Sequence, residues 1–219
     1  MFSIIIPAYN EEKYIEQTLQ SIHEQTEKDY EIIVVANGCT DKTTHIARKH
    51  CTVIELHQPN VSIARNTGAA HAKGDILLFL DADTRLSPNA LETVKRDFTQ
   101  KDAVATFISR PNHQRLSYST LLALKNFFHR TGIHPGASGT LVTRRDLFHR
   151  VGGFDKQLRL NEDDILIQAL TKHGRYKVLN AHATTSMRRY EKWGLVKLGL
   201  FWLSHKTVVY RNGEYEAVR

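Results

Sequence analysis

The chain is predicted to fold as an α/β protein with a mostly parallel central sheet and helices on both faces. Strand-like and helix-like segments alternate through its first half, an order that right-handed crossovers turn into a parallel sheet. The stretch Asp75–Asp83 contains five consecutive apolar residues, and such a run belongs in the buried centre of a parallel sheet. It ends in Asp81 and Asp83, at the edge where open parallel sheets bind their ligands.

The elements of the first half follow from hydrophobic period and turn residues. The expected strands are Ser3–Ile6, Glu31–Ala36, Thr52–Leu56 and Asp75–Asp83, and the expected helices are Glu12–Gln25, Asp41–Lys49 and Ser62–Lys73. Asn37-Gly38 closes the second strand, and Gly74 ends the third helix as a helix-terminating glycine does. A fourth helix is expected from Ser87, with Ser87 as cap and Pro88 in its first position.

The second half is less regular but continues the same pattern. The expected strands are Ala103–Ser109, Thr140–Thr143, Tyr176–Leu179 and Ala183–Ser186, and the expected helices are Leu116–His129, Arg145–Val151, Glu162–Lys172 and Trp193–Leu203. We find no internal repeat and no linker, so a single domain is predicted over residues 1–219. Within it, residues 186–219 are expected to form an amphipathic C-terminal segment.

Composition limits the function classes. A net charge of +7 and a pI near 9.4 favour an anionic partner, which leaves nucleotides, nucleic acids and phospholipid surfaces open. No nucleic-acid motif is present, so nucleic acid is not expected as a partner. Cys39 and Cys51 are too few for a disulfide framework or a zinc site. No segment reaches the ~18 apolar residues of a membrane span, and the first residues lack the basic flank of a signal peptide. A cytoplasmic protein, or one peripheral on the inner face of the membrane, is expected.

Polar residues follow three of the predicted strands. They are Pro7-Ala8-Tyr9-Asn10-Glu11, Ala36-Asn37-Gly38 and Asp81-Ala82-Asp83. Such groups at neighbouring carboxyl ends of parallel strands are where a nucleotide lies. Because neither a Gly-x-Gly-x-x-Gly nor a Gly-Lys-Ser/Thr loop is present, a diphosphate here needs a metal, and Asp81 and Asp83 are suited to Mn²⁺ or Mg²⁺. The alternative is that Asp-Ala-Asp only opens a turn.

These motifs and others in the same order resemble a family 2 glycosyltransferase of the GT-A fold, of the short stand-alone type. The similarity runs from about residue 3 to 172 through Ser3-Ile4-Ile5-Ile6-Pro7-Ala8-Tyr9-Asn10-Glu11-Glu12, Val34-Val35-Ala36-Asn37-Gly38-Cys39-Thr40-Asp41, Ala64-Arg65-Asn66 with Gly68, Gly74-Asp75, Asp81-Ala82-Asp83, Gly152-Gly153-Phe154-Asp155 and Glu162-Asp163. The resemblance implies a nucleotide-sugar donor, usually UDP-linked, a divalent metal, and usually inversion at the anomeric carbon.

The resemblance implies that residues 1–100 bind the nucleotide and that residues 101–185 face the acceptor. It also implies roles on the donor side. Pro7, Tyr9 and Glu11 are expected around the nucleobase and ribose. Asn37 stands where the family usually has an aspartate that reads the base edge; an amide there donates as well as accepts, and an ordinary turn at Asn37-Gly38 is the alternative. Arg65 is expected near the diphosphate, against the alternative of a surface arginine.

On the acceptor side, Glu162-Asp163-Asp164 matches the family's Glu-Asp pair, in which the aspartate acts as general base. Asp163 is therefore the predicted base. The alternative is that acids in the first helical turn only favour the helix dipole, with Asn161 as cap. Glu162 and the loop residues Gly136, Ser138 and Gly139 are expected in the pocket for acceptor and donor sugar, unless that loop is a plain connection.

Three late residues are further candidates. His182 is the best-placed histidine for a third metal position, with a structural histidine as the alternative. Arg188 and Arg189 are expected to close over the diphosphate as an electrostatic clamp, against the alternative of solvated charges.

The last apolar segment, Trp193 to Leu203, has two tryptophans and flanking lysines. This composition fits a helix in an anionic membrane surface, a helix on the sheet edge, or the contact of a homodimer. The acceptor is undecided among lipid-linked, glycan and small-molecule hydroxyls. Two other functions remain open: a nucleotidyltransferase of similar layout, and a catalytically silent nucleotide-sugar-binding module that docks on a membrane.

Overall fold

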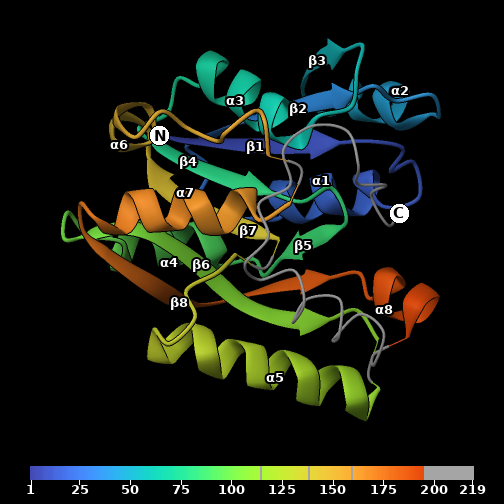
Figure 1. Cartoon of the computed structure of the whole chain (residues 1–219). Coiled ribbons are helices and arrows are strands. Elements are labelled where there is room, and N and C mark those ends of the chain that lie inside the picture. Colours follow the sequence, from blue (N-terminus) through green and yellow to red (C-terminus); the bar gives the residue numbers. More distant parts are fainter. Residues whose placement is uncertain (114, 138, 159, 195–219) are drawn as a thin grey trace.

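The protein is built on one eight-stranded sheet in the order β3-β2-β1-β4-β7-β6-β8-β5 (Figure 1). The structure is a computed structural model that describes residues 1–113, 115–137, 139–158 and 160–194. The strands are β1 (Phe2–Ala8), β2 (Tyr30–Asn37), β3 (Thr52–Leu56), β4 (Ile76–Leu80), β5 (Thr84–Leu86), β6 (Asp102–Pro111), β7 (Thr140–Arg144) and β8 (Arg175–Thr185). The helices are α1 (Ile15–His23), α2 (Thr43–Ala47), α3 (Val61–His71), α4 (Ala90–Asp97), α5 (Leu116–Thr131), α6 (Arg145–Arg150), α7 (Glu162–Thr171) and α8 (Arg188–Trp193).

The predicted fold class is confirmed. Strands β3, β2, β1 and β4 pair in parallel, as the alternation of elements requires. Strand β7 is antiparallel to both β4 and β6, while β6 and β8 are again parallel. The short β5 pairs antiparallel with β8 at the sheet edge. The sheet is therefore mixed, with its parallel half made entirely from the first half of the chain.

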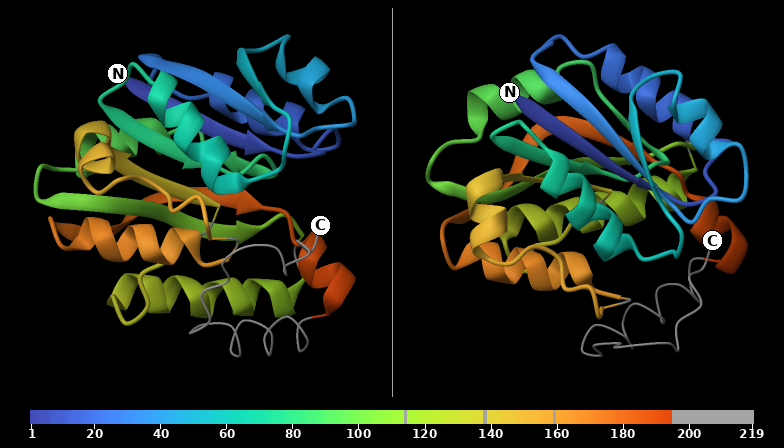
Figure 2. Two further views of the ribbon diagram at one scale, coloured as in Figure 1. Left: turned by 45° about the horizontal axis from the view of Figure 1, so that its top comes forward. Right: turned by 90° about the horizontal axis from the view of Figure 1, so that it is seen from above.

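Side chains of the central strands alternate between two cores, one on each face of the sheet. Ile4 and Ile6 of β1 pack with α1 and α4, whereas Ile5 packs with α3 on the opposite face. The second core also holds α6 and α7, which lie on that face in both views of Figure 2. Both faces of β1 and β4 are therefore covered, which is why these strands are apolar throughout.

Several expected boundaries were wrong. Strand β8 is continuous where two strands were expected, because a register shift opposite Phe107 and Ile108 lets Asn180 and Ala181 pass without breaking the pairing. Strand β5 and helix α8 were not expected, since elements of three and six residues are too short to show a period. The fourth helix begins at Ala90 and not at Pro88, because the Ala90 N–H bonds the Ser87 carbonyl in a turn that precedes it.

Most of the expected helix Trp193–Leu203 lies outside the described residues. Among the helices that the described ranges form, none has both the length and the apolar content to cross a bilayer.

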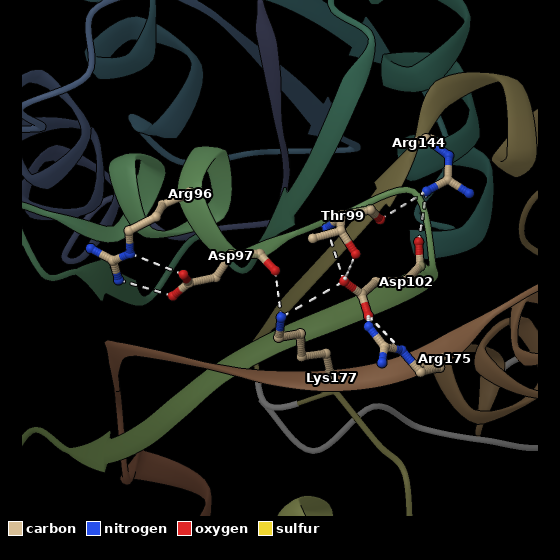
Figure 3. A network of polar contacts seen from close by, with 7 residues as sticks. All are labelled: Arg96, Asp97, Thr99, Asp102, Arg144, Arg175 and Lys177. Atoms are coloured by element: carbon tan, nitrogen blue, oxygen red, sulfur yellow. Dashed lines mark hydrogen bonds and ion pairs between the residues drawn. The ribbon is translucent and has the colours of Figure 1, made fainter.

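A buried carboxylate ties the three strands β6, β7 and β8 together at the end of the sheet remote from Asp81 (Figure 3). The Asp102 side chain is 1% exposed and accepts hydrogen bonds from the Thr99 N–H at 2.8 Å and from Nε and Nη2 of Arg175 at 3.1 and 2.9 Å. Its own carbonyl accepts from Arg144 of β7 at 2.7 Å. Burial alone would raise the pKa of Asp102, but the bonds from Thr99, Arg175 and the charge of Lys177 outweigh it and lower the pKa.

Asp102→Asn is expected to lower the free energy of unfolding by about 2–3 kcal/mol at pH 7, because the buried acceptor loses the charge that its donors surround. The pKa of Asp102 is lowered in the folded state. The stability that wild type has over the variant is therefore fully present above the ordinary aspartate pKa, and it disappears as the pH falls through the pKa of Asp102 in the folded protein. Urea unfolding at pH 7 and pH 3 measures this. The matched control, Asp97→Asn, removes a more exposed pair with Arg96 in the same region and should change stability by no more than ~0.5 kcal/mol.

Candidate functional site

The predicted convergence of strand ends occurs at Asp81. The backbone N–H of Asp81 donates to the Gly139 carbonyl at 2.9 Å, which holds the loop before β7 against the end of β4. Gly139 has a φ of +71°, and a Cβ there would lie 2.7 Å from Thr84 Oγ1 and 3.4 Å from Asp81 Oδ2. Only glycine fits so close to the carboxylate, so this loop is part of the site.

The buried guanidinium of Arg65, from α3, holds three carboxylates together. Its Nη2 lies 3.1 Å from Asp81, and its Nη1 lies 3.1 Å from Glu162 and 3.0 Å from Asp163. The predicted metal aspartate and the predicted base are thus joined through one side chain that is 8% exposed. The alternative of a surface arginine is wrong, because the Arg65 side chain is buried and pairs with acids of the protein; its contact with a diphosphate stays a prediction.

The arginine also explains two sequence motifs. Its guanidinium carbon lies 5.0 Å from the centre of the Phe154 ring, a cation–π contact. Its neighbour Asn66 donates to the Phe154 carbonyl at 2.7 Å and accepts from the Phe154 N–H at 2.9 Å. Gly153, with φ +70°, is needed because a Cβ would lie 2.7 Å from Asn66 Oδ1. The motif Gly152-Gly153-Phe154 therefore orients α3 and does not itself form the pocket.

Asp163 has the electrostatics of a general base. Burial raises its pKa to about 7; Arg65 opposes the shift, while Glu162, Asp81 and Asp164 add to it. A base works best when its pKa lies near the working pH. Asn161, at the start of α7, adopts the left-handed conformation at φ 60° and makes no side-chain cap, so the alternative in which it caps the helix is not supported. Such strain in a residue other than glycine is typical of functional sites.

A second arginine, Arg188 of α8, pairs with two further acids. It makes a two-pronged ion pair with Glu11, with one N–O distance of 2.6 Å, and lies 3.3 Å from Asp83. Its guanidinium carbon is 4.9 Å from the centre of the Tyr14 ring. The structure thus brings Glu11, Asp83 and Arg188 together, although 177 residues separate Glu11 from Arg188.

Asp81 and Asp83 are suited to a divalent cation that shares a diphosphate. Burial, and next the charge of Asp81, raises the pKa of Asp83 to about 6 even though Arg188 opposes the shift. Two carboxylates that repel each other at a strand end are relieved by a cation between them. Among the described residues no group of three or more His, Cys, Asp or Glu side chains is arranged to hold a metal.

Asn37, the last residue of β2, is 2% exposed. Its Oδ1 accepts from the Asn60 N–H at 2.8 Å, and Asn60 in turn caps α3 through the Ile63 N–H at 3.0 Å. Because the oxygen is used inside the protein, the amide N–H₂ is the group of the Asn37 side chain that is left to donate elsewhere. Pro7 and Tyr9 are partly buried at the end of β1, next to this position in the parallel sheet.

The remaining candidates are placed as follows. His182 lies in β8, and its pKa is lowered by burial and by Arg110 and Arg130; no described contact brings it to Asp81 or Asp83. Gly136 accepts a hydrogen bond from the Tyr176 hydroxyl at 2.8 Å, beside α5. Ser138 lies outside the described residues, and Arg189 is exposed on α8.

Sequence reasoning missed two features of the site. It did not foresee the internal partners of Arg65, although an arginine on the buried side of α3 signals a carboxylate within the protein. It also missed Lys125 of α5, whose electrostatic neighbours include Asp164, Asp163 and Asp81. The available signal was a lysine at helical spacing from Leu122 and His129.

Comparison with known proteins gives one coherent result. The family model described as Glycosyl transferase family 2 matches residues 3–155. An uncharacterized glycosyltransferase of Haemophilus influenzae is 28% identical over 78% of this chain and 62% of its own length. The minor teichoic acid biosynthesis protein GgaA of Bacillus subtilis is 26% identical over 98% of this chain and 52% of its own length. This chain thus spans less than two thirds of each of these relatives.

Solved structures agree on the fold. A mannosyltransferase, PcManGT from Pyrobaculum calidifontis, in complex with GDP-Man and Mn²⁺, has a TM-score of 0.73 at 20% identity, covering 98% of this chain and 65% of that one. TarS of S. aureus in complex with UDP-GlcNAc has a TM-score of 0.67 at 23% identity, covering 84% of this chain and 58% of that one.

Arg65→Met should reduce stability most at high pH. Without Arg65 the carboxylates of Asp81, Glu162 and Asp163 lose the cation that they share, so keeping them ionised costs more stability as pH increases. The loss relative to wild type is expected to reach about 3–5 kcal/mol at pH 8 and to be clearly smaller at pH 5. Urea unfolding without divalent cations measures it. Arg48→Met, which removes an exposed pair with Glu55, should change stability by under ~1 kcal/mol at either pH. If Arg65→Met lost the same stability at both pH values, Arg65 would not be the cation that stabilises the three ionised carboxylates.

Proposed function

Because the chain belongs to glycosyltransferase family 2, we propose that it moves one sugar from a nucleotide-sugar donor to an acceptor hydroxyl, with a divalent cation and with inversion at the anomeric carbon. The observation that carries this proposal is Asp163: a carboxylate with a pKa of about 7, held by Arg65 next to Asp81. The carboxylate proposed for the donor side, Asp81, and the one proposed for the acceptor side, Asp163, thus share the guanidinium of Arg65. A nucleotidyltransferase has no use for such a base, and this alternative is not favoured.

For the donor we propose a UDP-sugar first and a GDP-sugar as the competitor to test. Solved relatives of this fold carry UDP-GlcNAc in one case and GDP-Man in another. At Asn37 the free amide N–H₂ can donate to a carbonyl of uracil or of guanine. Pro7, Tyr9 and Glu11 would surround the base and ribose, as the family pattern implies.

Asp81 and Asp83 would hold Mn²⁺ or Mg²⁺ together with the donor diphosphate. The cation, when bound, neutralises the charge that develops on the departing diphosphate. Arg188 already faces Asp83 and Glu11, so it is placed to pair with the diphosphate once the donor enters. We infer a clamp role for Arg188, with Arg189 beside it on the exposed side.

Asp163 would remove the proton of the acceptor hydroxyl. The acceptor oxygen then forms a bond to the anomeric carbon while the bond from that carbon to the diphosphate oxygen breaks, and the electron pair leaves with the nucleoside diphosphate. Attack from the side opposite the leaving group inverts the anomeric centre. Glu162 and the Gly136–Gly139 loop would border the sugar, since Gly139 already contacts the Asp81 region.

Asp83→Asn should remove metal-dependent donor binding without unfolding the protein, because the side chain sits at a strand end. In a thermal-shift screen with UDP and GDP, with and without Mn²⁺, wild type should gain about 2.7 kcal/mol of stability at a hundredfold excess of nucleotide over Kd. The variant should gain little. Asp75→Asn, at the opposite end of the same strand and 82% exposed, is the matched control and should bind like wild type. Unchanged Mn²⁺ dependence in Asp83→Asn would refute the metal assignment.

Asp163→Asn should keep donor binding and slow transfer by about 10²–10⁴-fold, because the side chain keeps its shape but cannot accept a proton. In wild type the base is active only when ionised, so transfer should fall about tenfold per pH unit below the pKa of about 7. Transfer would be measured from pH 5 to 9 against a panel of sugars, polyols and their phosphates. Asp146→Asn, on the exposed side of α6, is the control. A near-normal rate in Asp163→Asn would move the base elsewhere, first to Asp164.

A further inference from the structure

Helix α5 is apolar on the side that faces away from the sheet as well as on the side that packs against it. Its inner side carries Tyr118, Leu122 and His129, which are 3–4% exposed. Asn126 bonds both the N–H and the carbonyl of Ser109 in β6, at 3.0 and 2.9 Å, which fixes the rotation of the helix. The residues on the opposite side are therefore held outward by the fold.

The outward side of α5 forms an uncharged stripe. Leu116, Leu124 and Phe127 stand on it at helical spacing and are 84, 53 and 57% exposed. Thr120 and Thr131 lie on the same stripe, and their hydroxyls donate to carbonyls of the helix itself at 2.9 and 3.1 Å. The stripe therefore offers apolar surface and little hydrogen bonding to a partner.

The stripe continues beyond the helix and is left uncovered. Ile133, directly after Gly132, is 71% exposed, and Phe128 at the edge of the stripe is 37% exposed. Among the described helices and strands, none lies on the outer side of α5 in Figure 1 or in the left view of Figure 2. A helix that is apolar all round is normally covered all round, and an exposed apolar patch marks a binding surface.

The charges around the stripe are basic. From Ala103 to Arg145 the chain contains no aspartate or glutamate. Arg115 and Arg130 stand at the two ends of the stripe, both are exposed, and neither makes an ion pair with a carboxylate in the part of the chain that the structure describes. Glu191 of α8 borders the first turn of α5, and its carboxylate lies 3.5 Å from His113. The face is thus apolar along its length and cationic at both ends.

These charges decide among the partners that such a face could have. A second copy of the chain would bring the same cationic ends, so a two-fold contact would place arginines against arginines. Residues 195–219, which lie outside the described residues, hold four basic residues against two acidic ones and do not match the charge either. An anionic lipid surface matches both features, because it takes up apolar side chains below its headgroups and attracts cations at headgroup height.

We propose that the outward face of α5, from Leu116 to Ile133, docks on an anionic phospholipid bilayer with the helix axis parallel to the membrane surface. Leu124 and Phe127 enter the boundary between headgroups and acyl chains, and Arg115 and Arg130 pair with lipid phosphates. Docking of this kind does not depend on which sugar or acceptor the protein uses.

The docked helix would bring the candidate site close to the bilayer. On the inner side of α5, His129 Nε2 lies 3.0 Å from the position that a Cβ on Gly136 would take. Gly136 belongs to the loop proposed to border the sugar. This loop is therefore separated from the membrane by about one helix diameter, ~10 Å.

Vesicle sedimentation with the whole chain tests the docking. Binding to vesicles of phosphatidylcholine with phosphatidylglycerol should exceed binding to phosphatidylcholine alone by at least about tenfold at low salt, because the lipid phosphates attract the arginines. The excess should shrink as salt rises, since salt screens exposed charges. Absence of binding to the anionic vesicles would overturn the proposal.

Apolar variants show whether α5 is the docking face. Leu124→Gln together with Phe127→Gln should lower the partition coefficient by at least about tenfold, because two side chains no longer gain from leaving water. Urea unfolding should be unchanged, since both residues are exposed and glutamine is a good helix former. Ile63→Gln, an exposed apolar residue of α3 far from α5 in Figure 1, is the control and should bind like wild type. Wild-type binding by the double variant would exclude α5.

Charge variants separate this face from the net charge of the protein. Arg115→Gln together with Arg130→Gln should lower binding by about 10–30-fold at low salt, because both cations lie at headgroup height. Lys49→Gln together with Lys101→Gln removes the same charge from exposed positions of other elements and should lower binding by less than about threefold. An equal loss in the two double variants would mean attraction by net charge alone and would overturn the proposal.

A photoreactive lipid identifies the segment that enters the bilayer. A diazirine in the acyl chain loses nitrogen on illumination, and the resulting carbene inserts into nearby bonds of the protein. Peptide mass spectrometry should find the label between Leu116 and Ile133. Labelling of residues 195–203 without labelling of α5 would move the membrane contact to that segment. A dimer in sedimentation velocity that Leu124→Gln with Phe127→Gln dissociates would assign the face to a second copy instead.

Discussion

The buried guanidinium of Arg65 is the point where helix α3, strand β4 and helix α7 meet. Three carboxylates from different parts of the chain could not lie so close together without a shared cation, because their repulsion in a site screened from water would separate them. Phe154 covers the guanidinium and Asn66 fixes Phe154. The spacing between the strand-end aspartates and the proposed base therefore depends on a contact inside the protein and not on the substrate.

The same principle organises the rest of the site. Arg188 pairs with Glu11 and Asp83 and reduces the repulsion between them, as Arg65 does for its three acids. Lys125 adds a third positive charge from α5. The two arginines differ in one respect: Arg65 is almost fully buried, whereas Arg188 is about a quarter exposed. Arg65 is thus a fixed part of the scaffold, and Arg188 is the one that an incoming anion can reach.

Sequence pattern was sufficient for the parallel half of the sheet and for the strand-end aspartates. An apolar run such as Ile76–Leu80 is stable only as a strand whose two faces are both covered, so it predicts a central position in a parallel sheet. The pattern could not show that β7 enters antiparallel next to β4, because strand direction is decided by connections and not by local period. Nor could it show the internal partners of Arg65, because Glu162 and Asp163 are distant in sequence and only the folded chain places them beside it.

The ion pair between Glu11 and Arg188 has a consequence for how the protein is made. The ends of this contact are 177 residues apart, and synthesis proceeds from the N-terminus at ~5–20 residues per second. A growing chain has its strand-end aspartates early, yet Glu11 lacks its partner until α8 leaves the ribosome. Contacts of such long range form late and slowly. The first half of the chain is therefore expected to exist for seconds during translation before this ion pair can form.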